Sequence, residues 1–413
     1  MQLWRRNFRF VWLNNCITAI GMMAFLPLFP LHLRELGITG AEARIWSGVL
    51  FAGAPLVAAF FSPFWGALGD RVGRRIMMVR SNVAIALCVA LMAWADSPWT
   101  LLLLRILQGM GSGFIAPSLT LVSVSAPAGE QGRVAGLLHT AVLAGGVMGP
   151  LLGGWIGDVH SFRAVFVVCA SLNVVALFVT LAYVREPTAE RGEGPAPAQR
   201  ALSWRDLGFK VFRDVGALLS AGPLRSVLVS VFAVRLGIGL VEPVLALFVE
   251  SMPDASETAL ATMAGLVAGA AWIPPLLLCT WLGRIGDRVG HGPLLLVCAA
   301  GGCVTYLAQA FADSLWVLYA FRFLSGAFVA GVFPAAYGLA SSHSDVSTRG
   351  GAFGMTFSSL ILANGLGACV GGALAAAVGL RLLFGVSAAL MALAVVRLAV
   401  RARRERNVAL QVR

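Results

Sequence analysis

The chain has 413 residues, of which 59% are hydrophobic and only 12% are charged, with a mean hydropathy of +0.84. Soluble globular proteins carry about 25% charged residues, so this chain lacks the polar surface that a soluble enzyme of its length needs. The composition also excludes an intrinsically disordered chain. The net charge of +12 does not indicate a nucleic-acid partner, because the charged residues lie between apolar runs.

Twelve apolar runs follow one another along the chain. A helix needs about 20 apolar residues to cross a bilayer, and irregular backbone cannot face lipid. The sequence therefore predicts an all-α integral membrane protein with twelve transmembrane helices. We expect the spans at 8–33, 45–68, 76–95, 99–124, 134–157, 162–184, 224–249, 260–282, 292–311, 315–340, 350–376 and 381–400.

A polar segment, 185–223, separates the sixth run from the seventh. It begins Pro-, Gly- and charge-rich, as flexible linkers do, and its second part is typical of an amphipathic helix on the membrane surface. We expect it to link an N-terminal six-helix half, 1–184, to a C-terminal half, 224–413. Of the 31 Lys and Arg, 24 lie on the side of both termini and four on the other. The positive-inside rule therefore places both termini and the linker in the cytoplasm.

The two halves repeat each other at an offset of about 217 residues. GALGDRVGRR at 66–75 aligns with GRIGDRVGHG at 283–292, and six positions are identical. The same offset pairs Arg105 with Arg322 and Pro117 with Pro334. An even number of spans keeps the halves in one orientation, related by a pseudo-twofold axis along the membrane normal. Two like halves suit alternating access, in which one half rocks against the other.

Three motifs stand out within these runs: GALGDRVGRR at 66–75, LRILQGMG at 104–111 and GGVMGPLLGG at 145–154. In this order they resemble the signature loop of the major facilitator superfamily, a motif of its proton-coupled members, and the motif of its drug:proton antiporters. The stretches at 46–51, 62–75 and 161–166 resemble the twelve-span bacterial multidrug exporters of the MdtG type. The resemblance implies a carrier of the bacterial inner membrane that works as a monomer within the lipid bilayer.

The resemblance also implies that the loop after the second run is a conformational latch that stabilises an outward-open state. Its glycines let helix ends pack closely, and its aspartate can accept hydrogen bonds at a helix N-terminus or pair with an arginine. We expect partners at Glu130 and Arg133, and a weaker latch in the second copy. The alternative is that the arginines only set the topology. The expected latch residues are Gly66, Gly69, Asp70, Arg71, Gly73, Arg74, Arg75, Arg133, Asp287 and Arg288.

The fifth run carries a face of small residues with a proline kink. The resemblance implies that this face is a hinge that prevents leak and favours antiport, and the alternative is ordinary close packing of helices. The expected hinge residues are Gly145, Gly149, Pro150, Gly153 and Gly154.

Ionisable residues inside membrane helices are costly and are therefore candidates for function. Four qualify, Arg105, Arg235, Glu242 and Arg322, and the resemblance implies that they face a central cavity. Glu242 is the only carboxylate deep within an expected span, so it can carry a proton or pair with substrate; a structural ion pair is the alternative. Pro243 should disturb the helix there. Arg235 lies about 10 Å away along the helix axis, so we expect no direct pairing.

For Arg105 the resemblance implies a part in proton coupling, and the alternative is a structural arginine bonded to backbone carbonyls. Arg322 is its repeat partner. Members of the family often place the coupling acid in the first span, but the first run here has none. Three arginines and one carboxylate would make the cavity cationic, so anionic and zwitterionic substrates remain candidates alongside cations.

The expected function is a proton-coupled secondary transporter that exports amphipathic small molecules, including drugs, by antiport. We expect no enzyme activity, no metal and no cofactor beyond protons as the coupling ion, because no metal cluster, nucleotide-binding motif or catalytic triad is present. Alternatives are an exporter or symporter of a specific metabolite, siderophore or lipid, and a non-transporting receptor or scaffold on the same fold.

Overall fold

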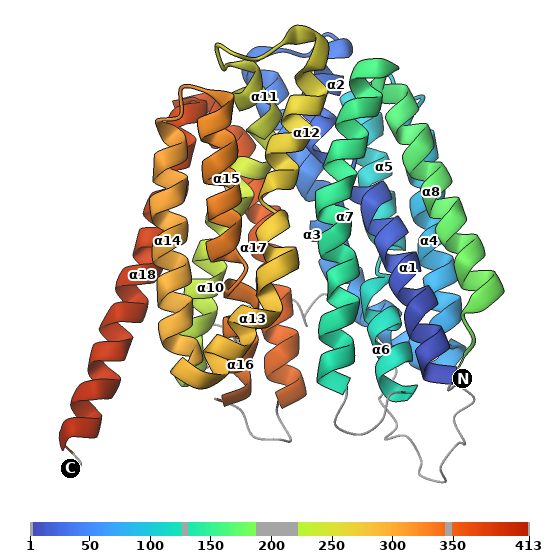
Figure 1. The fold of residues 1–413 in the computed structure, drawn as a ribbon. Helices are drawn as coiled ribbons and strands as arrows, with labels where there is room; N and C mark the ends of the chain where they lie inside the picture. Colours follow the sequence, from blue (N-terminus) through green and yellow to red (C-terminus); the bar gives the residue numbers. More distant parts are fainter. Residues whose placement is uncertain (1–2, 126–130, 187–221, 343–348, 412–413) are drawn as a thin grey trace.

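The computed structural model describes residues 3–125, 131–186, 222–342 and 349–411, which are helical apart from turns. Twelve segments are long and apolar enough to cross a membrane, which confirms the predicted number. Both chain ends lie at one end of the bundle (Figure 1), which we call the terminal face, in contrast to the opposite face. Most of the segment 185–223 lies outside the described residues, so its amphipathic helix and the boundaries of the halves stay predictions.

The N-terminal half contains the first six spans. Two of them are interrupted: span 1 consists of α1, η1 and α2, and span 4 consists of α5 and α6. The bounds are α1 (Leu3–Met23), η1 (Leu26–Leu28), α2 (Phe29–Glu35), α3 (Gly40–Val72), α4 (Arg74–Met92), α5 (Pro98–Gly111), α6 (Ile115–Ser125), α7 (Gln131–Val159) and α8 (Phe162–Tyr183).

The C-terminal half contains the other six. Span 7 consists of α10, η2 and α11, span 8 of η3, α12 and α13, and span 10 of α15 and α16. The bounds are α10 (Gly222–Val241), η2 (Glu242–Val244), α11 (Leu245–Glu250), η3 (Glu257–Ala259), α12 (Leu260–Ala270), α13 (Ile273–Val289), α14 (His291–Ala310), α15 (Leu315–Val329), α16 (Val332–Ser342), α17 (Arg349–Val378) and α18 (Leu380–Gln411).

Spans 1 and 7 break at equivalent places of the repeat. Pro27 and Pro243 each occupy the second position of a 3-10 turn, η1 and η2, because proline lacks the N–H that an α-helix needs there. The prediction that Pro243 disturbs the helix is confirmed. The two turns contact each other, so they bring the middle of span 1 against the middle of span 7.

The motif at 66–75 is helix rather than loop over most of its length. The helix α3 continues to Val72, past the apolar span that ends at Ser62. The expectation of a loop is wrong, because loss of hydropathy marks the membrane boundary and not the end of the helix. The turn itself is Gly73, with φ +112°, and its repeat partner Gly290 has φ +95°. Only glycine adopts such angles without strain.

The two halves meet along two helix pairs. The helix α3 packs against α17, and α7 packs against α12. Each pair has glycine at its closest approach: Gly48 meets Gly372, and Gly154 meets Gly265. These pairs correspond in the repeat, so the interface has the same pseudo-twofold symmetry as the sequence.

Candidate functional site

An ion pair lies inside span 7. Arg235 of α10 approaches Glu242 of η2, with 4.0 Å between Nη1 and Oε1. Their side chains are 24% and 16% exposed, so both are partly accessible. The expectation of no direct pairing is wrong, because both side chains are long and the α-helix ends at Val241, where the 3-10 turn redirects the chain.

A buried tyrosine lies beside this pair. Tyr306 of α14 is 2% exposed and lies within electrostatic range of Arg322, Glu242 and Arg235. Arg322 of α15 is 3% exposed, and its Nε has no hydrogen-bond partner in the described part of the chain. A buried donor without a partner is costly, so this N–H remains available to an acceptor. We call Arg235, Glu242, Tyr306 and Arg322 the charged cluster.

Arg105 lies in a different environment, enclosed within the N-terminal half at 2% exposure. Its Nε donates to the carbonyl of Leu50 at 2.8 Å, and its Nη2 donates to the carbonyl of Phe51 at 3.2 Å. Its Nη1 donates to Oε1 of Gln108 at 2.7 Å. The side chain therefore ties α5 to the middle of α3.

Two aromatic rings complete the surroundings of Arg105. The guanidinium carbon lies 5.8 Å from the ring centre of Phe25 and 5.6 Å from that of Phe29, within the range of a cation–π contact. This geometry matches the structural alternative, an arginine bonded to backbone carbonyls. A part for Arg105 in proton coupling stays a prediction.

A buried polar network joins spans 1, 3 and 6 in the same half. Nδ2 of Asn82 and Oγ1 of Thr180 each donate to Oδ1 of Asn14 at 2.8 Å. Thr18 donates to Oδ1 of Asn82 at 3.3 Å, and all four residues are 0% exposed. Such networks fix one helix arrangement. Sequence reasoning missed this network and Tyr306, because neutral polar residues and tyrosine do not stand out from an apolar run as charged residues do.

The predicted hinge of α7 has two rows of small residues with a spacing of four. A Cβ on the first row would overlap α1 of the same half or Ala24, the residue that follows it; this row is Gly145, Gly149 and Gly153. The second row meets the other half, at α12 and at Trp272; this row is Gly146, Pro150 and Gly154. Every predicted hinge residue thus lies at a helix contact. Its action as a hinge stays a prediction.

The turn at Gly73 is capped by an acid from the end of span 6. The Glu186 carboxylate accepts the N–H groups of Arg74 and Arg75 at 2.9 and 2.7 Å. The guanidinium of Arg75 donates to the carbonyl of Leu181 at 2.6 Å. A carboxylate at a helix N-terminus satisfies free N–H groups and complements the helix dipole. These contacts tie the motif to span 6 of the same half.

The other predicted latch residues of the first copy differ in their packing. Gly69 lies close to a methionine of α4, 3.1 Å from where its Cβ would be. The expectation of close packing is wrong at Gly66, where a Cβ would meet none of the described atoms within 4 Å. The side chains of Asp70 and Arg133, and the whole of Glu130, lie outside the described residues.

The remaining latch residues are exposed. In the second copy, Asp287 pairs with His291, with 3.2 Å between Oδ1 and Nε2. His291, which stands where the first copy has Arg74, therefore makes a local contact within its own motif. Arg71 and Arg288 extend at the terminal face, and the role of the whole set as a latch stays a prediction.

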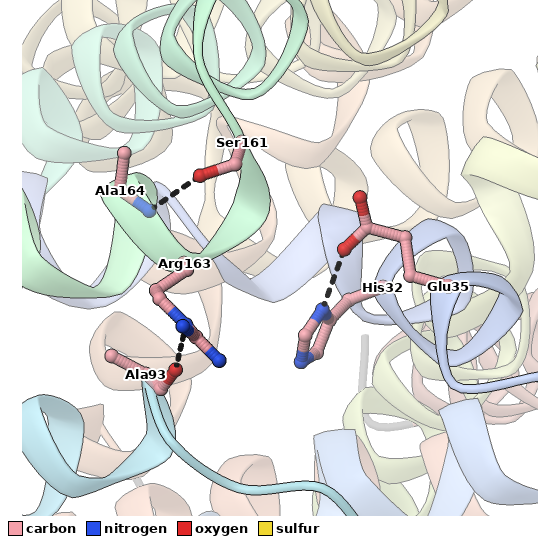
Figure 2. A network of polar contacts seen from close by, with 6 residues as sticks. All are labelled: His32, Glu35, Ala93, Ser161, Arg163 and Ala164. Atoms are coloured by element: carbon pink, nitrogen blue, oxygen red, sulfur yellow. Dashed lines mark hydrogen bonds and ion pairs between the residues drawn. The ribbon is translucent and has the colours of Figure 1, made fainter.

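The opposite face of the N-terminal half is held by helix-end contacts (Figure 2). Nε of Arg163 donates to the carbonyl of Ala93 at 2.9 Å, which fastens α8 to the end of α4. Ser161 caps the N-terminus of α8. Nδ1 of His32 lies 3.3 Å from a carboxylate oxygen of Glu35.

The charged cluster offers one partly exposed carboxylate, two guanidinium groups and a phenol. A carboxylate of this kind can take up and release a proton, and a guanidinium can bind an anionic group. In the part of the chain that the structure describes, no group of three or more His, Cys, Asp or Glu is placed to hold a metal ion.

Comparison with known proteins gives a family and several relatives. A family model described as the Major Facilitator Superfamily matches residues 11–256 and 227–411. The "Multidrug resistance protein MdtG" of Citrobacter koseri is 31% identical over 386 residues, which is 93% of this chain and 92% of the relative. The protein of the same name from Dickeya zeae is 31% identical over 392 residues, covering 94% and 92%.

Solved structures share the fold. The crystal structure of the human organic anion transporter MFSD10 (TETRAN) has a TM-score of 0.72 at 17% identity and covers 96% of this chain and 99% of that one. A bacterial homologue of the human lysosomal transporter Spinster, inward-facing and unoccupied, has a TM-score of 0.73 at 15% identity, with 97% of both chains covered. At these identities the likeness concerns the fold alone.

Proposed function

Because the chain belongs to the Major Facilitator Superfamily, we propose that it exports amphipathic small molecules, including drugs, in exchange for protons. The protein is a membrane transporter and not an enzyme. Relatives named multidrug resistance proteins over nearly the whole chain support drug efflux. The observation that carries the proposal is Glu242, a partly exposed carboxylate inside span 7 next to a guanidinium.

Glu242 is the proposed site of proton loading. Among the described residues it is the one acid that lies away from the span ends. In this proposal, substrate binds the charged cluster only when the Glu242 carboxylate is free of its proton, so substrate and proton compete for one site.

The proposed location is the bacterial inner membrane, with the terminal face towards the cytoplasm. The support is the excess of basic residues, 24 of 31, on the side of the two termini. Protons then enter from the opposite face. A single chain supplies both halves and the whole charged cluster, so we propose that the monomer is the working unit.

The proton gradient is large enough for this work. One proton moving down about 100 mV releases about 2.3 kcal/mol, and one pH unit adds about 1.4 kcal/mol. The sum of about 3.7 kcal/mol sustains a gradient of several hundredfold for a neutral substrate at one-for-one exchange. No further energy source is needed.

The charge of the cluster favours one subset of substrates. Two guanidinium groups, of Arg235 and Arg322, and the single carboxylate of Glu242 lie within electrostatic range of Tyr306, and Nε of Arg322 has no hydrogen-bond partner among the described residues. A cationic drug would gain little at such a site, whereas an anionic or zwitterionic amphiphile would pair with the arginines. We therefore place zwitterionic and anionic compounds ahead of simple cations.

The test uses inside-out membrane vesicles that contain the protein and have an acidic lumen. Fluorescent cationic, neutral, anionic and zwitterionic amphiphiles are added outside, and their accumulation is followed. We expect accumulation that a protonophore abolishes and that vesicles without the protein do not show. Accumulation that persists with the protonophore would contradict proton coupling. Accumulation of none of the amphiphiles would favour a narrow metabolite, siderophore or lipid carrier, or a receptor.

A further inference from the structure

Two hydrogen-bonded junctions join the halves at the opposite face. In the first, Asp158 near the end of α7 accepts two N–H groups from the first turn of α12. Its Oδ1 lies 2.9 Å from the nitrogen of Ala261, and its Oδ2 lies 2.6 Å from that of Thr262. In the second, Nη1 of Arg44, in the first turns of α3, donates to the carbonyl of Ala375 in the last turn of α17 at 3.1 Å.

The internal repeat maps one junction onto the other. An offset of 217 residues takes position 44 to 261, and the offset of 218 that aligns Gly154 with Gly372 takes position 158 to 376, next to Ala375. To within one residue, the same two repeat positions are therefore joined in both junctions, but the one that supplies the side chain in the first junction supplies the backbone group in the second. Helix N–H groups carry partial positive charge and helix carbonyls carry partial negative charge. A negative carboxylate therefore suits the N–H groups at the start of α12, and a positive guanidinium suits the carbonyl at the end of α17. The opposite charges of Asp158 and Arg44 follow from the opposite helix ends that they bind.

Tight helix contacts lie close to each junction. Gly154 meets Gly265 near the first, and Gly48 meets Gly372 near the second. Backbones that are already this close cannot move closer, so the halves can only part. Parting at the opposite face requires both junctions to break. An exposed ion pair between Arg34 and Glu250 adds a third link between the halves at this face.

We propose that Asp158 and Arg44 form a paired latch that holds the opposite face closed and whose release permits opening to that side. Both act as positioning residues, because they set the population of the two conformations and do not touch substrate. The inference rests on the twofold architecture and not on the identity of the substrate or the coupling ion.

Asp158 and Arg44 each have a matched control within one half. Asp254 accepts the N–H of Leu315 at 3.0 and 2.9 Å, so it caps α15 as Asp158 caps α12, but without crossing the interface. Arg163 donates to Ala93 as Arg44 donates to Ala375, again inside one half (Figure 2). These controls separate loss of a helix cap from loss of a link between halves.

The test is hydrogen–deuterium exchange, measured by mass spectrometry on the purified full-length protein with Asp158→Asn, Arg44→Gln or both changes. The decisive readout is the distant junction. Asp158→Asn should speed exchange by about tenfold at the start of α3, and Arg44→Gln should do the same at the start of α12, because a charge-assisted hydrogen bond stabilises the closed state. The double variant should exchange faster than either.

Asp254→Asn and Arg163→Gln should speed exchange only next to their own sites. Should Arg44→Gln fail to purify, Arg44→Lys, which keeps the charge with poorer geometry, should give a smaller increase at the start of α12. The proposal would be overturned if every variant at Asp158 or Arg44 kept the wild-type exchange rate at the distant junction. Equal increases in the controls would overturn it as well, since they would indicate general loosening.

Discussion

Arg105 and Arg322 occupy equivalent positions of the repeat but have different surroundings. Arg105 donates three hydrogen bonds inside the N-terminal half, whereas Nε of Arg322 has no partner. Arg322 and the ion pair of span 7, Arg235 and Glu242, all lie within electrostatic range of Tyr306. One copy of the repeated residue thus stabilises its half, and the other forms part of the charged cluster.

Arg105→Lys tests the structural reading at this position. Lysine keeps the charge, but its compact ammonium group cannot reproduce the planar set of bonds to Leu50, Phe51 and Gln108. We expect a loss of about 2 kcal/mol of stability, seen as a lower melting temperature of the purified protein. Arg284→Lys, an exposed change on α13, should leave that temperature unchanged. Equal melting temperatures for both variants would contradict the structural reading.

Tyr306→Phe tests whether the phenol belongs to the site. The change removes only the hydroxyl, which lies within electrostatic range of Arg322 and Glu242. We expect substrate accumulation in inside-out vesicles to fall about tenfold, because a buried guanidinium loses a polar neighbour. The amount of folded protein should stay the same. Tyr319→Phe, on the half-buried side of α15, is the control. An unaltered rate for Tyr306→Phe would remove the phenol from the site.

The helix α7 has two neighbouring rows of small residues: one contacts its own half and the other contacts the opposite half. Gly153→Ala would place a methyl group against the carbonyl of Ala24 within its own half, and Gly154→Ala would place one against Ala261 of the other half. We expect Gly153→Ala to lower the melting temperature. We expect Gly154→Ala to speed hydrogen exchange at the opposite face, because it weakens the contact between the halves.

Gly136→Ala on the same helix is the control for both changes. A Cβ there meets none of the described atoms within 4 Å, so alanine in place of glycine inside the helix should stabilise α7 by about 0.5–1 kcal/mol. The same effect of Gly153→Ala and Gly154→Ala on both measurements would contradict a division of labour between the two rows.

At the level of elements, local signals were readable and long-range contacts were not. Pro243 predicted the break in span 7 because proline disrupts the hydrogen bonds of the helix that contains it. The caps at Glu186 and Asp158 bind helix ends more than 100 residues away in sequence, and no local pattern marks such a partner. The last turn of α3, beyond the expected end of the span at residue 68, was missed because hydropathy reports burial in lipid rather than backbone conformation.

At the level of the whole molecule, twelve spans and the repeat followed from the sequence because both are periodic features of hydropathy and identity. The charges of the candidate site were visible for the same reason, since Arg235, Glu242 and Arg322 interrupt apolar runs. The resemblance implied that they face a common cavity, but their individual contacts were not visible, because these depend on how α10, α14 and α15 pack. Tyr306 became a candidate only through that packing.

The central claim is that Glu242 exchanges a proton for substrate. The most direct measurement is proton release from acid-loaded inside-out vesicles on addition of an amphiphile, compared between the wild type and Glu242→Gln, with similar amounts of protein in the membrane. Gln keeps the shape of the side chain but cannot ionise. The account predicts substrate-evoked proton release in the wild type and none in Glu242→Gln. Proton release of equal size in both would contradict it.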